Sequence, residues 1–201
     1  MCELLPLDEF RTAILIGDAS GHGIPANSVM ASARGAVHAL LEARSLSGLE
    51  TDELITIVNR ALMQITVAHQ FISLVLAVFD SRDRSLTYTN AGHPPPLHVR
   101  GSEVRSLDSQ GMLLGIVEAA GYTSAKIPLR SGDLMVMFTD GILEARDPDQ
   151  QFFKQDGVLA AINGRTTEPV GEILDTVWQN CELHAAGNHD DDRSLLVMRV
   201  L

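Results

Sequence analysis

The sequence has little cysteine and no long apolar segment. Its two cysteines, Cys2 and Cys181, lie far apart in the 201 residues and have neither a disulfide-framework pattern nor a zinc-ligand spacing. We expect both to be free thiols, as is usual in a reducing cytoplasm. No apolar run approaches the roughly 20 residues of a membrane-spanning helix, and Glu3 and Asp8 stand where a signal peptide would be basic. The sequence therefore predicts a cytoplasmic protein without a membrane-spanning helix.

Basic residues are also scarce, with 15 Lys and Arg against 26 Asp and Glu and a net charge of -11. Proteins that bind nucleic acid present a basic face to the phosphates, and anionic membrane surfaces attract clusters of Lys and Arg. We therefore expect neither nucleic acid nor a membrane surface as a partner. An acidic chain is compatible with bound cations, because they would cancel part of the local repulsion.

Several catalytic motifs are missing. The chain has no G-x-x-x-x-G-K-[ST] or G-x-G-x-x-G loop for a nucleotide, no H-E-x-x-H and no cysteine pair for zinc. Ser20 lies in Ala-Ser-Gly, which differs from the G-x-S-x-G turn of serine hydrolases. These absences exclude the commonest nucleotide, zinc and serine-nucleophile sites.

The apolar patterns predict a single α+β domain. At 201 residues and 45% hydrophobic content, with no linker or repeat, the chain can bury one substantial core. We expect strands at 3–7, 12–16, 71–79, 86–90, 125–129, 134–139 and 194–200, and helices at 25–44, 52–68, 154–163 and 170–184, with Thr51 as an N-cap. Hairpins at 3–16 and 125–139 favour antiparallel sheets with helices outside. Apolar stripes from Val29 to Leu41, Leu54 to Ile65 and Val170 to Cys181, the last including Trp178, should pack on the sheets.

Acidic residues stand at the ends of three of these apolar runs. Asp18 follows the run 12–16, Asp140 follows 134–138, and the acidic run 190–192 precedes 195–198. Carboxylates gathered at strand ends can form an oxygen-rich cage for a hard divalent cation. Each acid alone is also typical of a turn or a solvated loop, and the spacing by itself indicates only a candidate divalent-metal site. His22 and His93 could contact such a site or could be ordinary loop histidines.

Four motifs, in this order, resemble a known family. They are Gly17-Asp18-Ala19-Ser20-Gly21-His22-Gly23, Asn90-Ala91-Gly92-His93-Pro94-Pro95, Thr139-Asp140-Gly141 and Asp191-Asp192-Arg193-Ser194. The chain resembles the PPM-type (protein phosphatase 2C-like) metal-dependent serine/threonine phosphatases, in their bacterial stage II sporulation branch. The resemblance implies an α-β-β-α sandwich of two antiparallel sheets flanked by helices, extending from about Leu4 to the C-terminus.

The resemblance also implies an active site with two Mn²⁺ or Mg²⁺ ions and a bridging water or hydroxide. By position, Asp18 corresponds to the bridging ligand and the backbone carbonyl of Ala19 to its neighbour. Asp140 and Asp191 correspond to the other carboxylates, Asp191 being chosen by counting back three residues from Ser194. The helix after Gly23 could direct its N-terminus at the phosphate, which makes His22 and Gly23 candidate phosphate contacts.

The activity implied is hydrolysis of phosphoserine or phosphothreonine on a bacterial signalling protein, an anti-sigma-factor antagonist in this branch. Such domains are often outputs of longer proteins with sensor domains, and the helices at 25–44 and 52–68 are expected to carry any homodimer or activator contact. Family members usually have Gly-Gly-Asp and an aromatic residue before the stretch corresponding to 3–7, whereas this chain begins Met1-Cys2. An inactive, partner-binding pseudophosphatase and a hydrolase of small phosphoesters are the alternatives.

Overall fold

The computed structural model describes residues 1–43, 50–66, 70–108, 111–188 and 191–201. The chain divides into two compact units. Unit 1 comprises Met1–His93 and Ser109–Leu129, and unit 2 comprises Pro94–Asp108 and Arg130–Leu201. Each unit consists of one antiparallel sheet and the helices that cover it, which confirms the predicted α+β class.

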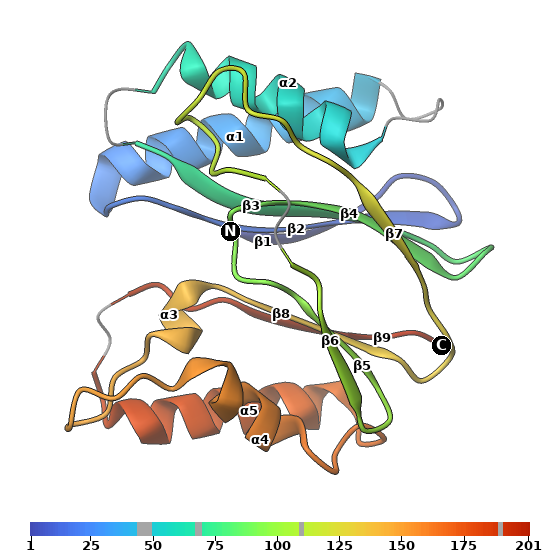
Figure 1. The fold of residues 1–201 in the computed structure, drawn as a ribbon, viewed down its shortest axis with the longest axis vertical. Helices are drawn as coiled ribbons and strands as arrows, with labels where there is room; N and C mark the ends of the chain where they lie inside the picture. Colours follow the sequence, from blue (N-terminus) through green and yellow to red (C-terminus); the bar gives the residue numbers. More distant parts are fainter. Residues whose placement is uncertain (44–49, 67–69, 109–110, 189–190) are drawn as a thin grey trace. The chain divides into compact units, whose positions relative to one another are not determined.

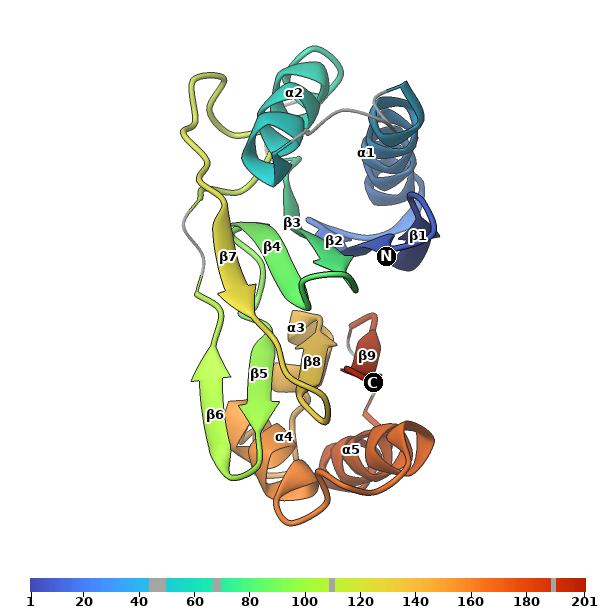
Figure 2. The same ribbon diagram turned by 90° about the vertical axis from the view of Figure 1, so that its right-hand side faces the viewer.

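Unit 1 contains a five-stranded sheet in the order β1-β2-β3-β4-β7, and every adjacent pair is antiparallel. Its strands are β1 (Cys2–Pro6), β2 (Arg11–Ala19), β3 (Ile72–Asp80), β4 (Ser85–Ala91) and β7 (Ala125–Pro128). Helices α1 (Gly23–Ala43) and α2 (Thr51–Met63) lie on one face of this sheet (Figures 1 and 2). The predicted hairpin at 3–16 is therefore confirmed.

The core of unit 1 lies between these helices and the sheet. The predicted stripes supply it: Val29, Ala33 and Val37 of α1 are buried, as are Leu54, Ile55, Val58 and Leu62 of α2. Two predictions about α2 are wrong. Ile65 lies beyond the end of the helix and is 55% exposed. Thr51 is the first helical residue and Glu50 is the N-cap, because the Thr51 hydroxyl bonds the Thr89 hydroxyl at 2.8 Å instead of capping the helix.

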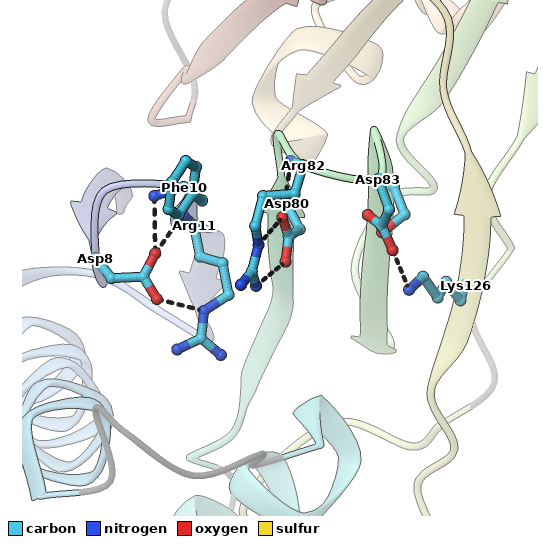
Figure 3. A network of polar contacts seen from close by, with 8 residues as sticks. Asp8, Phe10, Arg11, Asp80, Arg82, Asp83 and Lys126 are labelled. Atoms are coloured by element: carbon cyan, nitrogen blue, oxygen red, sulfur yellow. Dashed lines mark hydrogen bonds and ion pairs between the residues drawn. The ribbon is translucent and has the colours of Figure 1, made fainter.

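Acid–base pairs hold the turns at one end of this sheet (Figure 3). The pairs are Asp8–Arg11, Asp80–Arg82 and Asp83–Lys126. The Asp8 carboxylate also accepts the backbone N–H of Arg11 at 2.8 Å, so it closes the β1–β2 turn. Exposed pairs of this kind fix local geometry more than they add stability.

Unit 2 contains a four-stranded antiparallel sheet in the order β6-β5-β8-β9. Its strands are β5 (Leu97–Arg100), β6 (Glu103–Ser106), β8 (Leu134–Phe138) and β9 (Leu195–Arg199). Its helices are α3 (Asp140–Leu143), α4 (Lys154–Ile162) and α5 (Val170–Ala185), with α4 and α5 covering one sheet face (Figure 1). Ile173, Val177 and Cys181 of α5 are buried against the sheet, as predicted. Trp178, which was predicted to belong to the same stripe, is 36% exposed and does not join this core, so that part of the prediction is wrong.

The predicted hairpin of 125–129 with 134–139 is wrong. Strand β7 pairs with β4 in unit 1, and β8 pairs with β5 and β9 in unit 2. Asp133 is the physical reason, since its buried carboxylate accepts His98 Nε2 at 2.8 Å and Arg100 Nε at 2.9 Å. These contacts attach the start of β8 to β5.

Among the residues described, no helix combines the length and the apolar composition needed to cross a membrane. The two thiols are free, as expected, with Cys2 exposed and Cys181 buried.

Candidate metal centre

In unit 1, Asp18 lies near the end of β2, opposite Ser73 of β3. Asp18 is half-buried, and its backbone carbonyl accepts a hydrogen bond from the Ser73 hydroxyl at 3.4 Å. Gly17 allows this close approach, because a Cβ there would lie 2.5 Å from the backbone oxygen of Ser73. The sequence Gly-Asp thus serves strand packing and places a carboxylate at the exit of the strand.

His93 is a buried residue of unit 1. Its Nδ1 is 2.9 Å from the Ser73 hydroxyl, and its backbone N–H donates to Asn90 Oδ1 at 2.8 Å. His93 therefore reaches the Asp18 segment through the hydroxyl of Ser73, which also bonds the backbone carbonyl of Asp18.

The chain after Asp18 turns sharply into α1. Ala19 is buried and paired with Ile72. Gly21 and Gly23 have φ angles of +84° and +75°, a region that favours glycine. His22 and Gly23 are exposed, and the first turn of α1 contains no acidic residue. This helix N-terminus is therefore open to an anion.

Unit 2 brings Asp140 and Asp191 together. Strand β8 ends at Phe138, Thr139 is the N-cap of α3 and Asp140 is its first residue, so the chain at Asp140 enters a short helix and not the hairpin turn that Asp-Gly alone could also have indicated. A carboxylate oxygen of Asp140 lies within 4.8 Å of one of Asp191. The acidic run was predicted at 190–192; Asp190 lies outside the described residues.

Thr139 links the two acidic segments by hydrogen bonds. Its side-chain hydroxyl donates to the carbonyl of Asp192 at 3.2 Å and accepts the N–H of Ser194 at 2.9 Å. The N–H of Asp192 donates to the Asp191 carboxylate at 2.8 Å. The segment that carries Asp191 is therefore held against the start of α3.

The surroundings of Asp140 disfavour its negative charge. Burial raises the pKa of the Asp140 carboxyl, and the neighbouring charge of Asp191 raises it further, while the N–H of Gly141 opposes both. Two carboxylates this close fit a divalent cation that accepts oxygen ligands, because the cation would offset their repulsion.

A pocket of about 290 Å³ adjoins Asp191 within unit 2. Its lining is Gly141, Glu144, Ala145, Arg146, Asn188, Asp191 and Arg193. The guanidinium of Arg146 stacks on Phe152 at 4.8 Å, which holds an exposed positive charge at the pocket wall. No role was expected for Arg146, Arg193 or Thr139 from the sequence, although Thr139 and Arg193 belong to the motifs that carry the acids.

Comparison with known proteins identifies relatives along almost the whole chain. RsbU of Bacillus subtilis (strain 168), a phosphoserine phosphatase, is 27% identical over 200 residues, which cover 96% of this chain and 56% of RsbU. The chain thus spans about half the length of that relative.

Solved structures share the fold. The PP2C phosphatase domain of SpoIIE from Bacillus subtilis, solved with a fragment of its regulatory domain, has a TM-score of 0.85 at 23% identity, covering 100% of this chain and 58% of that one. RsbX, solved in complex with magnesium, has a TM-score of 0.70 at 14% identity, covering 98% and 84%. These likenesses confirm the phosphatase 2C fold that the resemblance implied. Residues 8–201 match the family described as Stage II sporulation protein E (SpoIIE), and the chain therefore belongs to the SpoIIE family.

Proposed function

We propose that this chain is a Mn²⁺- or Mg²⁺-dependent serine/threonine protein phosphatase, with residues 1–201 acting as one catalytic domain. The observation that carries the proposal is the pair Asp140 and Asp191, within 4.8 Å of each other in a chain of the SpoIIE family. RsbU, a relative over 96% of this chain, is a phosphoserine phosphatase, and the related fold of RsbX is solved with magnesium.

The proposed ligands are the carboxylates of Asp18, Asp140 and Asp191 and the backbone carbonyl of Ala19. Two bound divalent cations would supply a water of lowered pKa and would neutralise the phosphoryl oxygens. All four ligands offer oxygen, which suits Mn²⁺ and Mg²⁺ better than zinc. The assignment of Asp18 and Ala19 rests on the order of the motifs and on the family.

The proposed phosphate contact is the open N-terminus of α1. His22 and Gly23 are exposed there, and the backbone N–H groups of a first helical turn favour an anion. The pocket beside Asp191 would accept a side chain next to the phosphoserine, with Arg146 at its wall favouring an acidic one.

The proposed substrate is a phosphorylated signalling protein of the cytoplasm, an anti-sigma-factor antagonist, as the family resemblance suggests.

We further propose that α1 and α2 carry the contact with a second copy of the chain or with an upstream sensor domain, because α1 follows the Asp18 motif directly. Arg60 is exposed on α2. The variant Arg60→Glu should change self-association or manganese affinity, measured by sedimentation and calorimetry; no response to such surface changes along either helix would contradict this contact.

Phosphate release from a phosphoserine protein tests the activity. We expect turnover with Mn²⁺, none after chelation, and none in Asp140→Asn, whereas the control Asp147→Asn, on an exposed turn of the same unit, retains it. Turnover of p-nitrophenyl phosphate without turnover of the phosphoprotein would favour a small-phosphoester hydrolase. Manganese binding without any turnover would favour a partner-binding pseudophosphatase.

A further inference from the structure

Arg193 is an almost completely buried arginine beside the acidic pair of unit 2. Its side chain is 6% exposed, and three of its nitrogens bind different segments. Nε donates to the carbonyl of Gly141 at 3.2 Å, one terminal nitrogen pairs with Glu182 of α5 at 2.7 Å, and the other donates to the carbonyl of Asn188 at 2.7 Å.

These contacts connect the neighbours of both acids. Gly141 directly follows Asp140, while Asn188 precedes Asp191 by three residues and Arg193 follows it by two. The planar guanidinium fixes three directions at once, which an ammonium group on a flexible stem does not. The partner carboxylate of Glu182, at 2.7 Å, offsets the positive charge of Arg193, so geometry is its main contribution near the acids.

We propose that Arg193 is a positioning residue that sets the distance between the Asp140 and Asp191 carboxylates for metal binding. This inference rests on the proposed function, since it assumes that the two carboxylates bind Mn²⁺. Groups that orient the ligands of a metal typically affect its affinity by about 10–100-fold.

Arg199 provides a matched control in the same unit. It ends β9, and one of its terminal nitrogens donates to the carbonyls of Thr166 and Glu168, away from the acidic pair. Replacing either arginine by methionine removes hydrogen bonds to backbone carbonyls and should lower the melting temperature to a similar extent. Only the replacement of Arg193 should weaken the binding of Mn²⁺.

The test compares the wild-type chain with Arg193→Met, Arg193→Lys and Arg199→Met. Calorimetric titration with Mn²⁺ should give a dissociation constant about tenfold or more above wild type in both Arg193 variants, and an unchanged one in Arg199→Met. Hydrogen exchange in chelator should be faster at the amide of Ser194, which bonds Thr139, in both Arg193 variants only.

Three results would overturn the proposal: wild-type manganese affinity in Arg193→Met, equal weakening in Arg199→Met, or full affinity in Arg193→Lys, which would assign the effect to charge. The lysine variant keeps the test available if the methionine variant does not fold. A wild-type chain that binds no Mn²⁺ would instead contradict the proposed function, and Arg193 would then have no metal site to position.

Discussion

Replacing Asp140 by asparagine should stabilise the protein when no metal is bound. The carboxylates of Asp140 and Asp191 lie within 4.8 Å, and asparagine removes one of the two charges. It keeps an Oδ1 atom to accept the N–H of Gly141, a hydrogen bond of 3.1 Å in the wild type. The change therefore isolates the repulsion between the two acids.

The expected magnitude follows from Coulomb's law. At 4.8 Å the repulsion is about 0.9 kcal/mol at the dielectric constant of water and about 3.5 kcal/mol at an effective value near 20. Because Asp191 is exposed, solvent screening favours the lower figure. We expect Asp140→Asn to raise the free energy of unfolding by about 1 kcal/mol at neutral pH, or the melting temperature by about 2–4 °C.

The sign of the pH dependence is fixed by the pKa. The folded state raises the pKa of Asp140 above 3.8, so its ionised form destabilises the fold above the raised pKa. That penalty disappears as the pH falls through the raised pKa toward 3.8, and the advantage of asparagine should disappear with it. Thermal melts in chelator, at neutral and acid pH, measure both effects.

Bound manganese should reverse the order of stability, so that the wild type melts above Asp140→Asn. At 100 times its dissociation constant, a ligand stabilises the folded state by about 2.7 kcal/mol; the wild type should gain this, and Asp140→Asn should not. Asp175→Asn, an exposed position on α5, serves as the control and should follow the wild type in both conditions. An Asp140→Asn variant that melts below the wild type in chelator, or gains as much from Mn²⁺, would refute the reasoning.

Three further changes test the surroundings of the site. Arg146→Gln should lower kcat/KM for a phosphopeptide with an acidic neighbour about fivefold, the equivalent of about 1 kcal/mol for an exposed charge, and leave p-nitrophenyl phosphate hydrolysis unchanged. Gly141→Ala directs a Cβ at the backbone oxygen of Asp192 and should weaken Mn²⁺ binding about tenfold by calorimetry. Asp133→Ala leaves His98 without its carboxylate partner and should lower the free energy of unfolding in urea by about 3 kcal/mol. Because the pKa of Asp133 is lowered, the wild type should itself lose this contribution as the pH falls below 3.8. Unchanged peptide kinetics, metal affinity or urea midpoint, respectively, would contradict these expectations.

The long elements could be predicted because each carries its own periodic pattern. Strand β3 reads as a continuous apolar run, and α1 and α5 repeat apolar residues at helical spacing, so their types and approximate bounds follow from the sequence. The short hairpin of β5 and β6 was missed because four-residue strands carry too little pattern. The end of α2 was misjudged at Ile65, where the apolar spacing continues but the helix does not.

Pairing between strands could not be predicted from neighbouring residues. Strands β7 and β8 are adjacent in sequence and joined by a turn, yet they belong to different sheets. The decisive contacts of Asp133 are with His98 and Arg100, more than 30 residues away in the chain. Nothing in a local pattern indicates such a contact.

The candidate site could likewise be predicted only in part. The order of the Asp-Gly and Asp-Asp motifs indicated that Asp140 and Asp191 belong together, and unit 2 brings their carboxylates within 4.8 Å. The metal-binding roles of these acids, and of Asp18 with them, remain predictions. The burial of Arg193 could not be foreseen, because it results from the joint approach of α3, α5 and the segment before β9.

Crystals of the wild-type chain grown with MnCl₂, with anomalous scattering recorded at the manganese edge, test the central claim most directly. We expect two manganese peaks, with oxygens of Asp18, Asp140 and Asp191 and the carbonyl of Ala19 at about 2.1 Å, the distance of hard-cation ligands. Peaks elsewhere, or none at a manganese concentration that supports phosphate release, would contradict the account.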